Sequence, residues 1–316
     1  MKNKPKIEVG GQAVIEGVMM RGPKYIATAI RRKDGTIEID KKQFISKTKN
    51  NKFFALPILR GFVGLIEMMI IGFKTLNFSA SRAELDLEEK KEKSETKEKI
   101  NEIFSYIFAF SLAFLLFAFL PYQIAEWMNL GKGNIYFNLF AGSIRIVFFV
   151  LYVWLIGLMK DVHRIFQFHG AEHKAVHAFE NKNDLTPKNV QKFSTLHPRC
   201  GTSFMFFVLL IAILIFSVAD TIFAYFWGAP HIFIRLGYHF LMMPLISGIS
   251  YEVLKLSGKN INHPLVRLMT APGLLLQRIT TQKPNDQQVE IAVVAMKCAL
   301  EMDVLEYDNI TFLDEK

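Results

Sequence analysis

The apolar residues of this chain come in blocks long enough to cross a lipid bilayer. A transmembrane helix needs about 20 consecutive, mostly apolar residues to cover the roughly 30 Å hydrocarbon core. Four stretches meet this requirement, at residues 103–125, 135–159, 204–227 and 231–254. The pattern therefore predicts a mainly α membrane protein with about four transmembrane helices.

Charged or helix-breaking residues interrupt three of these predicted spans, the third of them at Asp220 alone. Arg145 lies in the second span, where an arginine near the bilayer centre costs about 2.5 to 3.5 kcal/mol on insertion scales. It is expected either to pair inside the protein or to form part of an anion site. The last span contains Arg235, His239 and Pro244, which predict a broken helix. Glu252, near its inner end, is expected to be a further metal ligand or a partner of Arg145.

The segment before the first span is amphipathic. Across residues 53–80, Arg60, Glu67 and Lys74 recur at seven-residue spacing, which places them in one stripe of a helix. Such a helix is expected to lie in the membrane interface or to pack on the bundle. Residues 84–99 are dense in Glu and Lys and are expected to form a solvated helix or linker.

The N-terminal part has a strand-like pattern. Residues 10–52 mix β-branched residues with glycines, and Lys33-Asp34-Gly35 separates two strand-like runs, which is typical of a β-hairpin. Glu16 lies between apolar neighbours. It is either a strand residue that faces solvent or a ligand or base that the glycines bring close to a site.

Beyond the last span the chain becomes amphipathic again. Residues 263–281 predict an interfacial helix that is broken at Pro272 and Gly273, and Asn285 and Asp286 offer N-caps for a final helix. The chain thus divides into an N-terminal β-rich cytosolic unit (1–52), an interfacial helix with a charged linker (53–102), a four-helix transmembrane region with a polar excursion at 160–203 (103–254), and C-terminal cytosolic or interfacial helices (255–316).

Charge sets the expected orientation. A net charge of +9 would suggest nucleic acid in a soluble protein. Here 51% of the residues are hydrophobic, nearly all Lys and Arg lie outside the spans, and the short loops at 126–134 and 228–231 hold only Lys132. The positive-inside rule therefore predicts a multi-pass protein of the bacterial cell membrane with both termini and the 160–203 excursion in the cytosol. Its basic side chains would attract anionic lipids, and no specific DNA binding is expected.

The candidate chemistry begins directly after the second span. His169, Glu172, His173, His177 and Glu180 share one face of a helix at about 100° per residue. The His-x-x-Glu-His spacing is that of inverted zincins, in which two imidazoles bind Zn²⁺ and the carboxylate between them activates water. The alternative interpretation is the wet face of a helix that leaves the membrane, where such residues bind no metal.

A second cluster, His197 and Cys200, would complete a metal shell. Pro198 and Gly201 force a turn that offers an imidazole and a thiol three residues apart. Nitrogen, sulfur and oxygen ligands together favour zinc or another divalent transition metal. A cysteine in such a position can equally be an inert small hydrophobic residue. No disulfide is expected, because both cysteines lie on the predicted cytosolic side.

The most distinctive motifs occur together in one protein family. They lie at residues 10–23, 168–174, 197–204, 248–252 and 271–281. In these motifs, and over nearly its whole length, the chain resembles the YqhQ-like bacterial multipass membrane proteins, a domain of unknown function labelled as predicted metal-dependent enzymes. The resemblance implies a metal site with His169, Glu172, His173, His197 and Cys200, whereas His177 lies outside the family pattern.

Three functions are compatible with these patterns. The first is a metal-dependent hydrolase that acts on a lipid-linked or membrane substrate at the cytosolic face, with Glu172 as the general base. The second is a non-catalytic scaffold, or a factor for membrane-protein insertion or assembly, with a structural metal site and a basic face suited to a ribosome. The third is a transporter built around Arg145 and Arg235, which would have to oligomerise. A cysteine ligand and a filled shell of four ligands would favour the second, because a catalytic ion keeps one position open.

Overall fold

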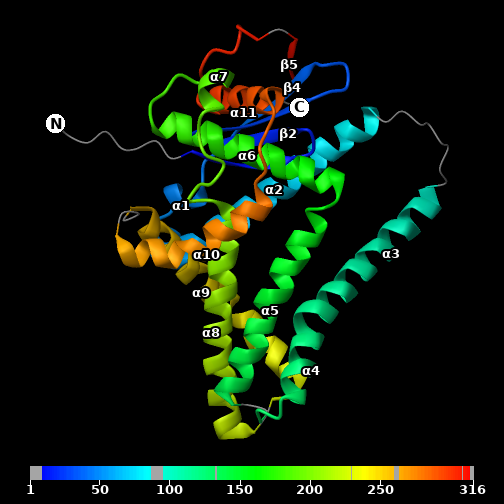
Figure 1. Cartoon of the computed structure of the whole chain (residues 1–316), viewed down its shortest axis with the longest axis vertical. Coiled ribbons are helices and arrows are strands. Elements are labelled where there is room, and N and C mark those ends of the chain that lie inside the picture. Colours follow the sequence, from blue (N-terminus) through cyan, green and yellow to red (C-terminus); the bar gives the residue numbers. More distant parts are fainter. Residues whose placement is uncertain are drawn as a thin grey trace.

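The computed structural model describes residues 9–86, 95–131, 134–228, 230–259, 263–307 and 309–313. Lys132 and part of the charged segment predicted at 84–99 fall outside these ranges. Figure 1 shows a bundle of long helices and, at one end of it, a sheet covered by shorter helices. The shorter and connecting helices are α1 (Lys47–Asn50), α2 (Leu59–Asp86), α6 (Lys160–Glu180), α7 (Pro187–Val190), α10 (Pro264–Thr280) and α11 (Asp286–Ala299).

The bundle confirms the predicted membrane fold. Within the described ranges, four helical segments are long and apolar enough to cross a membrane, namely Ile103–Trp127, Ile135–Ile156, Gly201–Trp227 and Phe233–Ser257. They belong to α3 (Glu95–Phe114) with its continuation α4 (Leu120–Trp127), and to α5 (Ile135–Ile156), α8 (Gly201–Trp227) and α9 (Ile232–Lys259). The C-terminal ends of α4 and α8 and the N-terminal ends of α5 and α9 lie at the end of the bundle farthest from the sheet (Figure 1).

Two predicted helix breaks are wrong. Helix α9 continues through Pro244, and α10 continues through Pro272. A proline removes one N–H donor, and a helix among other helices tolerates this loss where neighbouring groups compensate. Gly273 allows α10 to approach α8 closely, because a Cβ at this position would lie 2.8 Å from Ser203 Oγ of α8.

The irregular helix is the first span. Residues Leu115–Phe119 (η1) form a π-helical turn between α3 and α4. Pro121 has no N–H to offer the Phe117 carbonyl four residues earlier, and Arg145 Nε donates to that oxygen at 2.9 Å. Arg145 is thus paired inside the protein through its Nε, and its partner is a backbone oxygen.

Helix α2 ties the bundle to the sheet. Of its two predicted placements, packing on the bundle is the one observed, since α2 lies against α9. Arg60 of α2 forms an ion pair with Glu252 of α9 at 2.5 Å. Pairing of Glu252 with Arg145, one of its two predicted roles, is therefore not observed. Glu67, on the predicted charged stripe, is buried and accepts a hydrogen bond from Ser46 Oγ at 2.7 Å. These charges therefore act within the protein.

The sheet combines both ends of the chain. Four strands form an antiparallel meander, β1 (Gly10–Val14), β2 (Gly17–Arg21), β3 (Tyr25–Arg31) and β4 (Ile37–Gln43), and β5 (Ile310–Phe312) pairs in parallel with β4. The predicted hairpin at Lys33-Asp34-Gly35 joins β3 to β4, and Gly35 has the positive φ, 90°, that favours glycine there. The strand β5 was not predicted, because three residues are too few for a recognisable alternation.

Helices cover both faces of this sheet. Val18 and Met20 of β2 point into the core that α6 and α11 form, whereas Met19 packs with Ile71 of α2 on the opposite face. Helix α6 uses small residues, including the fully buried Ala171, to approach the sheet closely. His169 of α6 lies next to Cys200, the residue directly before α8.

Candidate metal centre

His169 presents one nitrogen to the thiol of Cys200. Its Nδ1 lies 2.8 Å from the carbonyl oxygen of Thr280, at the end of α10. A carbonyl only accepts hydrogen bonds, so the ring proton must sit on Nδ1. The lone pair of Nε2 then points toward Cys200 Sγ, 3.2 Å away.

His173, one turn later on α6, is also oriented by a hydrogen bond from its Nδ1 to a backbone carbonyl. Its Nδ1 donates to the carbonyl oxygen of Thr195. Its Nε2 is buried and has no hydrogen-bond partner among the residues that the structure describes. An unpaired nitrogen is costly in a side chain that is only 2% exposed. A bound cation would satisfy it.

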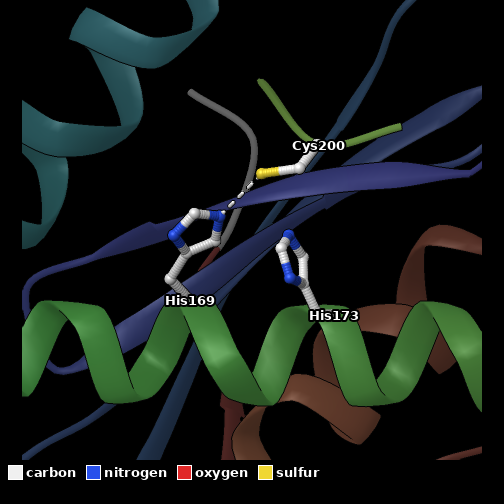
Figure 2. A group of neighbouring side chains, drawn as sticks. All are labelled: His169, His173 and Cys200. Carbon is white, nitrogen blue, oxygen red and sulfur yellow. Dashed lines mark hydrogen bonds between the residues drawn. The ribbon is translucent and has the colours of Figure 1, made fainter. Parts of the chain in front are cut away.

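Cys200 completes the group from another element. It is the N-cap of α8, where its Sγ accepts a hydrogen bond from the backbone N–H of Thr202 at 3.4 Å. The ligand atoms of His169, His173 and Cys200 all lie within 4.8 Å of one another. Figure 2 shows the two imidazoles rising from α6 toward the sulfur.

The three donor atoms fit a transition-metal ion. Two imidazole nitrogens and one sulfur form a donor set typical of Zn²⁺. Atoms bound to one tetrahedral zinc lie about 3.3 to 3.7 Å apart, as the usual bond lengths require. The separation of His169 Nε2 from Cys200 Sγ, 3.2 Å, is already close to this range. Burial lowers the pKa of both His169 and His173, which favours the neutral form that binds metals.

Glu172 lies beside this group. Its Oε2 is 3.5 Å from His173 Nε2, and its side chain is almost fully buried. Burial raises the pKa of its carboxyl, while the charges of nearby His169 and His197 and a hydrogen bond from the backbone of Gly11 act in the opposite direction. Gly11 is required at this contact, because a Cβ there would lie 2.3 Å from the Met19 carbonyl oxygen.

Two predicted imidazoles do not join the group. His197 lies near it, with its ring centroid 5.8 Å from that of His173. However, its Nδ1 accepts from the backbone N–H of Arg199 at 3.3 Å, which leaves the proton on Nε2, 3.4 Å from Glu180. His177 Nε2 donates to the carbonyl oxygen of Leu196 at 2.8 Å. These two rings therefore hold the 195–200 segment against α6.

Glu16 also lies apart from the group. It occupies the tight turn between β1 and β2 with φ of 54°, and its carboxylate pairs with the guanidinium of Arg164 near the start of α6. Glu252 and Arg145 belong to the bundle contacts described above. The second cysteine, Cys298, lies in the core of α11, where burial raises the pKa of its thiol to about 11.

Sequence reasoning missed the groups that orient the site. The carbonyls of Thr195 and Thr280 set the two imidazoles, and every residue type has a carbonyl, so no side-chain pattern marks them. Gln277 is the exception, since its buried amide accepts from the N–H of His197 and donates to the carbonyl of the same residue. A polar residue on the apolar side of an amphipathic helix was the available signal.

We expect Gly170→Ala to destabilise this arrangement. A Cβ on Gly170 would lie 2.1 Å from the carbonyl oxygen of Gln282, a backbone atom. Overpacking typically costs about 1 to 3 kcal/mol, against a gain of up to about 1 kcal/mol from alanine in a helix. The melting temperature of the full-length protein in detergent should fall. Gly64→Ala in α2, whose Cβ would meet nothing within 4 Å, should leave it unchanged or raise it. An unchanged melting temperature for Gly170→Ala would contradict the expectation.

Comparison with known proteins gives a consistent family assignment. A family described as "Protein of unknown function (DUF1385)" matches residues 56–302. The "Uncharacterized protein YqhQ" of Bacillus subtilis (strain 168) is 32% identical over 319 residues, which cover 98% of this chain and 97% of that protein. No solved structure matches the chain. The resemblance expected from the motifs is thereby confirmed.

Proposed function

The chain belongs to the DUF1385 family, whose function is unknown, and from its His–Cys group we propose that it is a metal-dependent hydrolase at the membrane surface. One observation carries the proposal. Three ligands converge, while the predicted fourth, His197, is engaged by Arg199 and Glu180. A tetrahedral ion held by three side chains keeps one position for water or substrate, which is the pattern of catalytic zinc sites.

The side chains have separate tasks in this proposal. His169, His173 and Cys200 would hold the ion, with the tautomers of both imidazoles fixed by backbone carbonyls. A divalent ion bound there would supply Lewis acidity, polarising a carbonyl or phosphoryl oxygen and lowering the pKa of water. Glu172 would accept a proton on Oε2, which is 3.5 Å from His173 Nε2, and would return it to the leaving group.

The position of the group suggests the class of substrate. Cys200 is the N-cap of a helix long enough to cross a membrane, and His169 lies within hydrogen-bond distance of the carbonyl oxygen of Thr280, the last residue of α10. The reacting groups thus lie within a few residues of the apolar segments. A substrate anchored in the bilayer, such as a lipid-linked molecule, would reach this level. The distribution of Lys and Arg supports the cytosolic face of the bacterial cell membrane.

Burial favours a second candidate. His173, Cys200 and Glu172 are each about 95% buried or more, and an enclosed ion with a cysteine ligand is common in structural sites. The protein would then be a scaffold or an assembly factor for membrane proteins, in which the ion holds the 195–200 segment on α6. Anionic lipids, or a ribosome on the basic face, would be its partners.

Metal content is the first test of either candidate. Full-length protein purified in detergent without chelators should contain close to one divalent transition-metal ion per chain, measured by elemental mass spectrometry. A protein that neither retains an ion nor binds one on addition of Zn²⁺ would rule out both candidates. The two are then separated through Glu172, as described in the Discussion.

A further inference from the structure

A second buried polar group lies inside the bundle, away from the His–Cys group. Its centre is Asp220 of α8, which is only 2% exposed. Its carboxylate accepts hydrogen bonds from Tyr238, from His239 Nε2 at 2.7 Å and from the guanidinium of Arg235, all on α9. Three donors therefore share this carboxylate.

Asn138 of α5 adds an unsatisfied donor. Its Oδ1 accepts from Arg235 Nη2 at 2.9 Å, and since arginine only donates, the orientation of the amide is determined. Its Nδ2 has no hydrogen-bond partner among the described residues, although Asn138 is only 4% exposed. A buried amide of this kind requires an acceptor.

The group also has an excess of positive charge. Arg145 lies seven residues after Asn138, two turns along the same face of α5. The charges of Arg235 and Asp220 both act on its guanidinium, yet no carboxylate of the described chain lies within ion-pair distance of it. Arg145, Arg235 and Asp220 thus bring two positive charges and one negative charge into the apolar bundle, where a net charge is costly.

We propose that this group binds a phosphate-type oxyanion, which accepts hydrogen bonds from Asn138 Nδ2 and from the free edge of the Arg145 guanidinium. An oxyanion supplies the missing acceptor and balances the charge, and arginine is well suited to pair with phosphate oxygens. Asn138 lies three residues after the start of α5, so roughly 5 Å from that end of the helix. Phospholipid headgroups occupy this level, and free phosphate can approach it from water. The inference is independent of the metal centre.

The test uses Asn138→Asp in the full-length protein. Aspartate keeps an oxygen for Arg235, removes the N–H donor and adds a negative charge, so the network should fold while the oxyanion is repelled. The matched control is Ser217→Ala in α8. It removes a buried hydroxyl one turn from Asp220 whose hydrogen bond, among the described residues, goes to the Ile213 carbonyl.

Native mass spectrometry would count ligands retained on protein in phosphate-free detergent. Phosphatidylglycerol would be compared with diacylglycerol of the same chains, and inorganic phosphate would be added as a competitor. We expect wild type and Ser217→Ala to retain phosphatidylglycerol at least tenfold better than Asn138→Asp does, and to show no such difference with diacylglycerol. Displacement by millimolar phosphate would identify free phosphate as the source, and its failure would identify the lipid. Equal retention by wild type and Asn138→Asp, or no retention by wild type, would overturn the proposal.

Discussion

Replacing His173 with alanine is expected to remove the metal from the purified protein. The ring supplies one of three converging donor atoms, and its Nε2 is the buried nitrogen that lacks any other described partner. Mutation of groups that merely orient ligands costs 10- to 100-fold in affinity, so loss of a ligand should cost more than about a hundredfold. Elemental mass spectrometry after purification should find the ion near one per chain in wild type and close to none in His173→Ala.

Two matched variants distinguish ligand loss from general damage. His177→Ala and His197→Ala remove imidazoles of the same cluster that bond to Leu196 and to Arg199 and Glu180. Both should retain the ion, although each should lower the melting temperature by removing a buried hydrogen bond worth about 1 kcal/mol. Metal retained in His173→Ala, or lost equally in His197→Ala, would contradict the three-ligand assignment.

Glu172→Gln should abolish the proposed hydrolysis without loss of the proposed ion. Glutamine has the same shape and can still accept the hydrogen bond from the backbone of Gly11 through its amide oxygen, but it cannot take up a proton. Removal of a general base typically lowers the rate by about 10² to 10⁴-fold. Lipids extracted from cells that overproduce wild type or variant would be compared by mass spectrometry, together with metal content and melting temperature.

Glu16→Gln is the control for this experiment. It also replaces a glutamate in contact with α6, but one that pairs with Arg164 away from the group. It should leave both lipid profile and metal content as in wild type. If Glu172→Gln gives the wild-type lipid profile while wild-type protein holds the ion, the site is structural and the scaffold function is supported.

Local pattern was sufficient for much of the fold. The four spans, the hairpin at Lys33 to Gly35 and a helix over His169 to Glu180, which the structure extends back to Lys160, follow from the identities of neighbouring residues. The length of an apolar run, the residues of a turn and the spacing along a helix are local properties of the sequence. They can therefore be identified without the tertiary structure. His169 and His173 lie close together for the same reason, since they are one helical turn apart.

The remaining features depend on segments that are distant in the chain. The sequence predicts both Cys200 and His197 as ligands, because one turn places them near each other. The tertiary contacts of this turn bring the thiol to the two imidazoles and engage the His197 ring elsewhere. Glu252 met Arg60 instead of Arg145 because α2 packs on α9. The sequence by itself determines which hydrogen-bond donors, acceptors and charges are available. The tertiary structure decides which of them become partners, because a closely packed interior leaves few buried polar groups unpaired.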